Sequence, residues 1–257
     1  MKRRWSEHPL FRFGYARVRI RLIQARNTPE MEAQEQECFS ERSRLRPDQF
    51  YPLNVSREEL TSQALDGMHA VMIGGAGEYS ATRDYPWTPS LFDVVYRARD
   101  RKLPIFGSCW GHQILARAFG GEVIYDGARA ELGCGLVELT PEGQRDELFG
   151  TLPQRFRVNM GHHDRVSRLP EDAVELAFNA SQRFQAFRMA DAPIYGTQFH
   201  SELDADRERE RVIAYRDYYA ELAPEDAFQG VLASLADTTD VDHLLHDFVK
   251  SFIVDGT

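Results

Sequence analysis

The segment Leu103-Pro-Ile-Phe-Gly107-Ser108-Cys109-Trp110-Gly111-His112-Gln113 decides the fold of this chain. A short apolar run leads into Gly-x-Cys-x-Gly, and a stretch containing Ala and Leu follows until Gly120-Gly121. This order predicts a strand, a sharp turn and a helix, with Cys109 at the turn as in a nucleophile elbow. Glycine is expected on both sides, because a Cβ in so crowded a turn would collide with the neighbouring strand or helix. A buried cysteine in an ordinary connection is the alternative, which the two flanking glycines disfavour.

A base for this cysteine is predicted close to another strand end. Ile194 to Phe199 reads as a buried strand, and His200-Ser201-Glu202 follows it. Residues two apart in an extended chain point to the same side, so Glu202 can orient the imidazole of His200. The chain has 8 histidines, so His-x-Glu alone indicates little. Because a cysteine nucleophile needs an oriented base, the elbow and this pair together predict a catalytic triad.

A glycine-rich loop forms the third motif. The apolar run from Ala70 to Ile73 ends in Gly74-Gly75-Ala76-Gly77, whose backbone N–H groups are able to point at an anion. The loop has neither the Gly-Lys-Ser/Thr of a phosphate-binding loop nor the glycine spacing of a dinucleotide fold. We therefore predict an oxyanion hole made by the N–H groups of Gly75 and Trp110, with a plain tight turn as the alternative.

With these motifs the chain resembles the class I (triad) glutamine amidotransferases, and most closely their GMP-synthase-like branch. The family elbow, Gly-x-Cys-x-Gly-x-Gln, corresponds to Gly107–Gln113, and the family His-x-Glu to His200–Glu202. A family segment of roughly Met-Ser-His-x-Asp is similar to Met160-Gly161-His162-His163-Asp164, with Gly161 in place of Ser. The oxyanion loop has Ala76 where the family usually has Pro. The resemblance covers most of the chain, from about residue 18 to residue 203.

The resemblance implies an activity and a set of substrate contacts. Cys109 would attack the side-chain amide of glutamine or of another γ-glutamyl compound, and neither a metal nor a cofactor is implied. The positions that would bind the substrate are Gly74, Gly111, Gln113, Gly161 and His162.

The order of the elements predicts an α/β fold with a doubly wound, mostly parallel sheet and helices on both faces, flavodoxin-like as in the resembled family. Alternating strands and helices produce this arrangement, and the motifs then meet at the carboxyl ends of the strands. An antiparallel part is expected within Glu122–Thr140. The predicted strands are 18–25, 50–55, 70–73, 103–106, 156–159, 173–179 and 194–199, and the predicted helices are 29–44, one opening at the capping-box pattern of 56–59, and 91–101.

The character of the sequence changes after Leu203. Residues 204–223 and 240–253 are predicted as two helices separated by Pro224. We divide the chain into an amidotransferase domain, residues 1–203, and a C-terminal helical extension, residues 204–257, packed on the same domain. A docking surface for a partner or a second copy is the alternative for these helices.

Composition narrows the function further. The net charge of −9 argues against binding nucleic acid through bulk electrostatics, and the arginine-rich segment 1–26 is read as solvated positions around the first strand. No apolar run reaches the about 20 residues that a membrane span needs, and no secretory leader is expected. Three cysteines without a disulfide framework predict a cytoplasmic protein.

Three functions remain open from the sequence. The first is a glutaminase that passes ammonia to a separate synthetase or acceptor, since no ATP-binding signature is present. The second is a freestanding hydrolase of γ-glutamyl amides or peptides. The third, a binding protein on the same fold, is disfavoured by the complete triad. The oligomeric state is left open.

Overall fold

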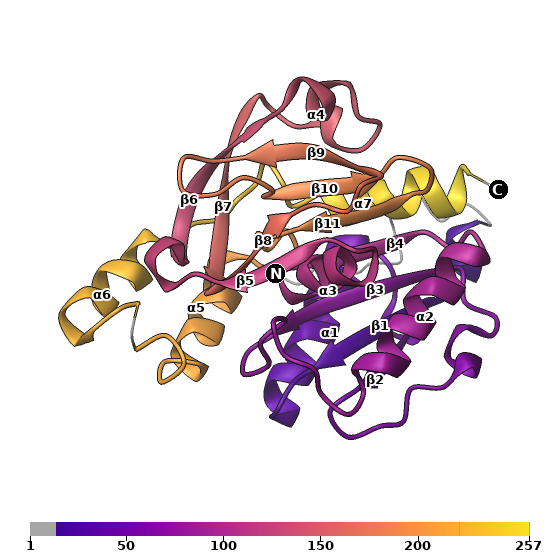
Figure 1. Ribbon diagram of the computed structural model, residues 1–257, viewed down its shortest axis with the longest axis horizontal. Coiled ribbons are helices and arrows are strands. Elements are labelled where there is room, and N and C mark those ends of the chain that lie inside the picture. Colours follow the sequence, from indigo (N-terminus) through magenta and orange to yellow (C-terminus); the bar gives the residue numbers. More distant parts are fainter. Residues whose placement is uncertain (1–13, 221, 257) are drawn as a thin grey trace, which may run out of the picture.

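The computed structural model describes residues 14–220 and 222–256 (Figure 1). Arg3, Arg4 and Arg12 of the arginine-rich segment lie outside the described residues, whereas Arg17 and Arg19 are exposed beside the first strand, as predicted. The prediction of solvated positions is wrong for Arg21, which is half-buried and donates to the Ala64 carbonyl at 2.7 Å, and for Arg26, which is buried. Among the described residues no helix is long and apolar enough to cross a bilayer.

The core of the molecule is a nine-stranded sheet of order β2-β1-β3-β4-β11-β10-β9-β6-β7. The first five strands in this order are parallel, and the remaining neighbours pair antiparallel. This mostly parallel half confirms the predicted fold class. The strands are β1 Ile20–Ala25, β2 Phe50–Asn54, β3 Ala70–Ala76, β4 Ile105–Ser108, β6 Glu131–Leu139, β7 Arg155–His162, β9 Ala173–Phe178, β10 Ala186–Met189 and β11 Ile194–Thr197.

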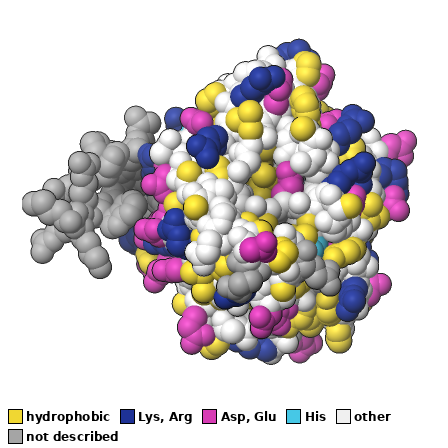
Figure 2. All heavy atoms as spheres, turned by 90° about the vertical axis from the view of Figure 1, so that its left-hand side faces the viewer, with side chains coloured by type: hydrophobic (Ala, Val, Ile, Leu, Met, Phe, Trp, Pro, Cys, Tyr) yellow, Lys and Arg dark blue, Asp and Glu magenta, His cyan; other side chains and the backbone are white. Residues whose placement is uncertain are grey.

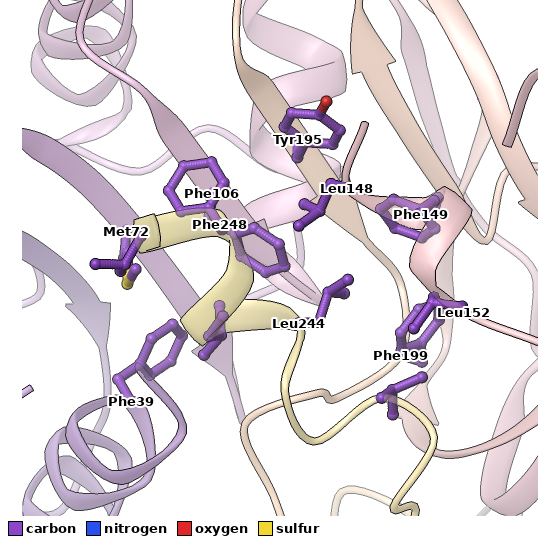
Figure 3. Packing of buried hydrophobic residues seen from close by; sticks show 14 of the residues in the cluster. Phe39, Met72, Phe106, Leu148, Phe149, Leu152, Tyr195, Phe199, Leu244 and Phe248 are labelled. Atoms are coloured by element: carbon purple, nitrogen blue, oxygen red, sulfur yellow. The ribbon is translucent and has the colours of Figure 1, made fainter. Parts of the chain in front are cut away.

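Helices cover both faces of the parallel half, because alternate residues of each strand face opposite ways. Met72 packs in the same cluster as Phe39 of α1 (Pro29–Ser43) and Phe248 of α7 (Leu244–Val249) (Figure 3). Its neighbour Ile73 instead joins the cluster formed with α2 (Thr88–Asp100) and α3 (Trp110–Ala118). The sheet is thus doubly wound, with α1 and α7 on one side and α2 and α3 on the other.

One local prediction is wrong, and another holds in part because the strands within 122–140 are antiparallel to their neighbours. No helix opens at Ser56: its N–H donates to the Asn54 side chain, and the Glu58 carboxylate accepts from the Asn54 N–H at 2.8 Å, so these polar groups close a turn instead. The two strands within 122–140 do not pair with each other. β5 (Glu122–Tyr125) forms a separate two-stranded sheet with β8 (Asp164–Arg168), whereas β6 joins the large sheet between β7 and β9.

In its described residues, the C-terminal segment contains three α-helices where two were predicted. α5 spans Ala205–Ala214, with the Asp204 side chain accepting from the Arg207 N–H, and turns follow it instead of the predicted continuation to residue 223. Pro224 precedes α6 (Glu225–Ser234), which the sequence analysis missed because it treated this proline only as a break. α7 continues into a π-helical turn, Lys250–Val254. Acidic, basic and hydrophobic side chains are interspersed on the face carrying α5 and α6 (Figure 2).

Candidate active site

The nucleophile lies at the centre of the sheet. β4 runs between β3 and β11, and Cys109 follows it with a φ of 50°; its N–H donates to the Thr197 carbonyl at 2.7 Å. This positive φ is strained for a residue with a side chain and marks the predicted elbow. A Cβ on Gly107 would lie 2.5 Å from the Gly111 carbonyl carbon, and one on Gly111 would collide with the carbonyl of β3. Both glycines are therefore required by close packing.

The predicted base and its orienting group meet as expected. His200 follows β11, and its Nδ1 lies 2.6 Å from Glu202 Oε1, with both side chains buried. The other Glu202 oxygen accepts from the Ser108 hydroxyl at 2.8 Å, and the His200 N–H donates to the Asn159 carbonyl at 3.1 Å. Cys109 also contributes to the electrostatics of the His200 imidazole. The structure thus brings the three predicted triad residues together at the ends of the neighbouring strands β4 and β11.

Electrostatics favour a charged His200–Glu202 pair. Burial alone disfavours the imidazolium, but the nearby charges of Glu202 and Glu208 outweigh it and hold the pKa of His200 well above its ordinary value. Burial likewise disfavours the carboxylate, yet His200 and then Arg211 lower the pKa of Glu202 to about 2. His200 thus carries a proton at neutral pH and is able to deliver it to a leaving amine.

The glycine loop has a partner that the sequence did not indicate. The Gly75 N–H donates to Glu35 Oε1 of α1 at 3.0 Å, and the same carboxylate forms a buried ion pair of 2.5 Å with Arg26. This N–H is therefore not directed at Cys109. Its role in an oxyanion hole stays a prediction that requires the peptide to change partner. Trp110, the other predicted donor, is the first residue of α3, where N–H groups have no partner within the helix.

Comparison with known proteins agrees with this geometry. The family model of class-I glutamine amidotransferases matches residues 43–216, which is more than half of the chain. The chain belongs to the class-I glutamine amidotransferase family. It is therefore an enzyme of this type, and the resemblance inferred from its motifs is confirmed.

Relatives of this amidotransferase include proteins named as GMP synthases. It is 30% identical over 174 residues to one subunit of the glutamine-hydrolysing GMP synthase of Methanothermobacter thermautotrophicus, covering 67% of this chain and 83% of that protein. It is 32% identical over 155 residues to the GMP synthase of Thermosipho africanus, covering 60% of this chain but 28% of that protein.

Solved structures show the same fold. A glutamine amidotransferase from Thermotoga maritima superposes with a TM-score of 0.69 at 23% identity, over 91% of this chain and 98% of that one. A glutamine amidotransferase from Methylobacillus flagellatus superposes with a TM-score of 0.70 at 21% identity, over 90% of this chain and 94% of that one.

The predicted substrate positions of the amidotransferase lie around the triad, but two side chains have internal partners. Gln113 donates to the Asp164 carbonyl at 2.6 Å and to Gln198 Oε1 at 3.0 Å. The His162 ring contacts the Asp164 carbonyl at 3.0 Å, and its other nitrogen lies 3.3 Å from the Glu131 carboxylate. Both side chains make contacts within the protein in this arrangement, so their roles as substrate contacts remain predictions.

The predicted substrate positions that are glycines, Gly74, Gly111 and Gly161, can contribute only through their backbone. The Gly161 carbonyl lies 3.9 Å from Cys109 Sγ, and a Cβ on Gly74 would collide with the Glu35 carboxylate. Gly111 packs against β3, so its part in the site is steric. Within the described residues no group of three or more His, Cys, Asp or Glu side chains has an arrangement that could hold a metal ion.

The sequence analysis missed the contribution of α5. Arg211 Nη1 lies 3.5 Å from Glu202 Oε1, and its Nε donates to Gln34 Oε1 at 3.2 Å. Glu208, one turn earlier, is 1% exposed and acts electrostatically on His200. Tyr219, after the helix, donates to the Gly161 carbonyl at 2.9 Å. The sequence of this helix is charged on every side. The only available signal was the three-residue spacing between Glu208 and Arg211.

Proposed function

We propose that this amidotransferase hydrolyses the side-chain amide of glutamine and releases ammonia for a partner protein or acceptor. The observation that carries the proposal is the Cys109–His200–Glu202 group at the carboxyl ends of β4 and β11, with its 2.6 Å His200–Glu202 contact. This arrangement combines a nucleophile with an oriented acid and base, as acyl transfer requires.

The proposed reaction has two halves. Cys109 Sγ, as thiolate, attacks the amide carbon, and the negative charge moves to the carbonyl oxygen near the Trp110 N–H. The carbon–nitrogen bond then breaks while His200 gives its proton to the leaving nitrogen, so that ammonia and a γ-glutamyl thioester form. The neutral imidazole next accepts a proton from water, whose oxygen attacks the thioester and releases glutamate and the cysteine.

Glutamine as substrate and a separate acceptor for ammonia are supported by the relatives. The Methanothermobacter protein is named as one subunit of a glutamine-hydrolysing GMP synthase, and this chain spans 83% of its length. We infer a similar division of labour here, in which a synthetase supplied by another polypeptide consumes the ammonia. The cytoplasmic location, the division of the chain at Leu203 and the lack of a cofactor stay predictions.

A substrate panel on the purified protein tests the proposal. Release of ammonia from glutamine is measured beside release of amine from γ-glutamyl peptides and alkylamides, with Cys109→Ser as the blank. Glutamine hydrolysis that depends on Cys109 and rises when a synthetase partner is added supports the proposal. Efficient cleavage of γ-glutamyl peptides with little action on glutamine would replace the proposal with a freestanding hydrolase. If no substrate is turned over and glutamine analogues do not alkylate Cys109, the proposal is contradicted.

A further inference from the structure

Glu208 is a buried carboxylate near the nucleophile that takes part in the reaction above only through its effect on His200. It lies on the inner face of α5 and is 1% exposed, and its Oε2 is buried without a hydrogen-bond partner among the described residues. No ion pair within 4.0 Å is found for it in residues 14–220 and 222–256, although Arg211 follows three positions later. A buried carboxylate without a direct partner is costly, so its retention here calls for a function.

Contacts around Gly161 show where Glu208 lies relative to the nucleophile. A Cβ on Gly161 would lie 3.5 Å from Glu208 Oε1 and 2.8 Å from the Tyr219 hydroxyl. The carbonyl of the same glycine lies 3.9 Å from Cys109 Sγ and accepts from Tyr219. Glu208 is therefore separated from the nucleophile by a single peptide group. The absence of a side chain at residue 161 leaves the space in which α5 and Tyr219 approach β7.

The groups around this space are hydrogen-bond acceptors. The Glu208 carboxylate and the Gly161 carbonyl both accept, and the Tyr219 hydroxyl uses its proton on that carbonyl. Burial is the main cause that raises the pKa of Tyr219, and Glu202 is the main cause that raises the pKa of His200; Glu208 adds to both effects. These acceptors are complementary to a group with several N–H donors and a positive charge.

We propose that Glu208 binds an ammonium group of the substrate next to Cys109. The proposal rests on the hydrolysis of a γ-glutamyl amide proposed above and adds a recognition residue to that site. An alkylammonium group has two sources in such a substrate: the α-ammonium of the glutamyl part, or a positively charged amine in the leaving group. In either case α5 supplies a determinant of specificity, and substrates that lack the ammonium group lose this contact.

Four substrates distinguish these sources when wild type and Glu208→Gln are compared. Glutamine is paired with glutaramate, which lacks the α-ammonium, and γ-glutamyl-(4-aminobutyl)amide is paired with γ-glutamyl-butylamide, which lacks the distal charge. The measured quantity is the ratio of kcat/KM within each pair, because any effect of Glu208 on His200 is common to both members and cancels. Glu210→Gln is the matched control, since Glu210 is an exposed carboxylate of the same helix that accepts from Gln34.

We expect the preference for the ammonium-bearing member of one pair to fall about 10- to 100-fold in Glu208→Gln, as for loss of a charge-assisted hydrogen bond, and to stay unchanged in Glu210→Gln. A fall in the first pair identifies the α-ammonium, and a fall in the second identifies the leaving amine. Where turnover is slow, the rate of Cys109 alkylation by a glutamine-like diazo ketone and its desamino analogue gives the first ratio.

The outcomes separate this inference from the proposed function. If Glu208→Gln slows all four substrates equally, or none of them, Glu208 recognises no ammonium group and serves His200 or the packing of α5. If wild type acts on none of the four and neither diazo ketone labels Cys109, the proposed function itself fails. The melting temperature of Glu208→Gln is measured first, and Glu208→Asp provides a second variant that keeps the charge if the amide variant does not fold.

Discussion

The parallel half of the sheet and the segment after Leu203 build the same site in different ways. In the parallel half, the proposed reacting groups lie close to strand ends: Cys109 directly follows β4, and His200 lies three residues after the end of β11. In the C-terminal segment, Glu208 and Arg211 reach the site from one face of α5, at helical spacing, with solvated residues between them. The first mode leaves contiguous motifs in the sequence, whereas the second leaves almost none.

The two regions differ in function as well as in how easily their site residues are predicted from the sequence. The parallel half holds the proposed reacting groups, and α5 adds charges near them: His200 is the main cause that lowers the pKa of Glu202, and Arg211 of α5 lowers it further. α7 meanwhile completes the core through Leu244 and Phe248. The segment predicted as a covering or docking extension is therefore in contact with the catalytic group.

The largest effect is expected in the parallel half. Cys109→Ser should reduce hydrolysis of glutamine to background while the protein stays folded, because the triad loses its nucleophile. Cys134→Ser, which changes a half-buried cysteine of β6, is the control and should remain active. A chloroketone analogue of glutamine should label Cys109 and spare Cys38, since burial raises the pKa of the Cys38 thiol to about 12. Peptide mapping that places the label on Cys38 or Cys134 would refute the assignment.

A smaller effect is expected from the C-terminal segment. Arg211→Gln should lower kcat about tenfold, or roughly 1.4 kcal/mol, with little change in KM, because Glu202 loses the positive charge 3.5 Å away. The Glu202 carboxylate should then become protonated at a higher pH, so that the acidic limb of the pH–kcat profile moves to higher pH. Arg211→Lys should restore part of the rate.

Arg209→Gln is the control for that comparison, because Arg209 lies on the same helix and pairs with Asp206 away from the triad. An Arg211→Gln enzyme with the wild-type rate and pH profile would show that α5 contributes only packing. The two regions would then differ in function as clearly as they do in sequence.

The smallest effect concerns stability against pH. The pKa of Glu202 in the folded protein is about 2, below its ordinary value of 4.5, so its stabilising contribution is complete above about pH 4.5 and is lost as the pH falls towards 2. The free energy of unfolding by urea should therefore differ more between wild type and Glu202→Gln at pH 6 than at pH 3. Glu142→Gln removes an exposed carboxylate paired with Arg145 and should show no such convergence. A difference that is constant with pH would contradict the assigned charge state.

The sequence was sufficient for the elements whose signals are local. Short apolar runs located most of the parallel strands, and glycine spacing located the elbow, although β4 ends at Ser108, two residues beyond the predicted end. Pairing partners depend on contacts between distant segments, so β5 with β8 was not foreseen. The bond from Gly75 to Glu35 was missed for the same reason, because it joins residues 40 positions apart.

The place of α7 in the core has a consequence for synthesis of the protein on the ribosome. Cys109 emerges well before residues 244–253, whose apolar side chains fill the cluster around Phe106 and Tyr195. A nascent chain that has reached Leu203 contains the whole triad but lacks both α5 beside it and the helix that closes one side of the sheet. Burial of this core, and with it a rigid site, must therefore wait until translation has passed α7.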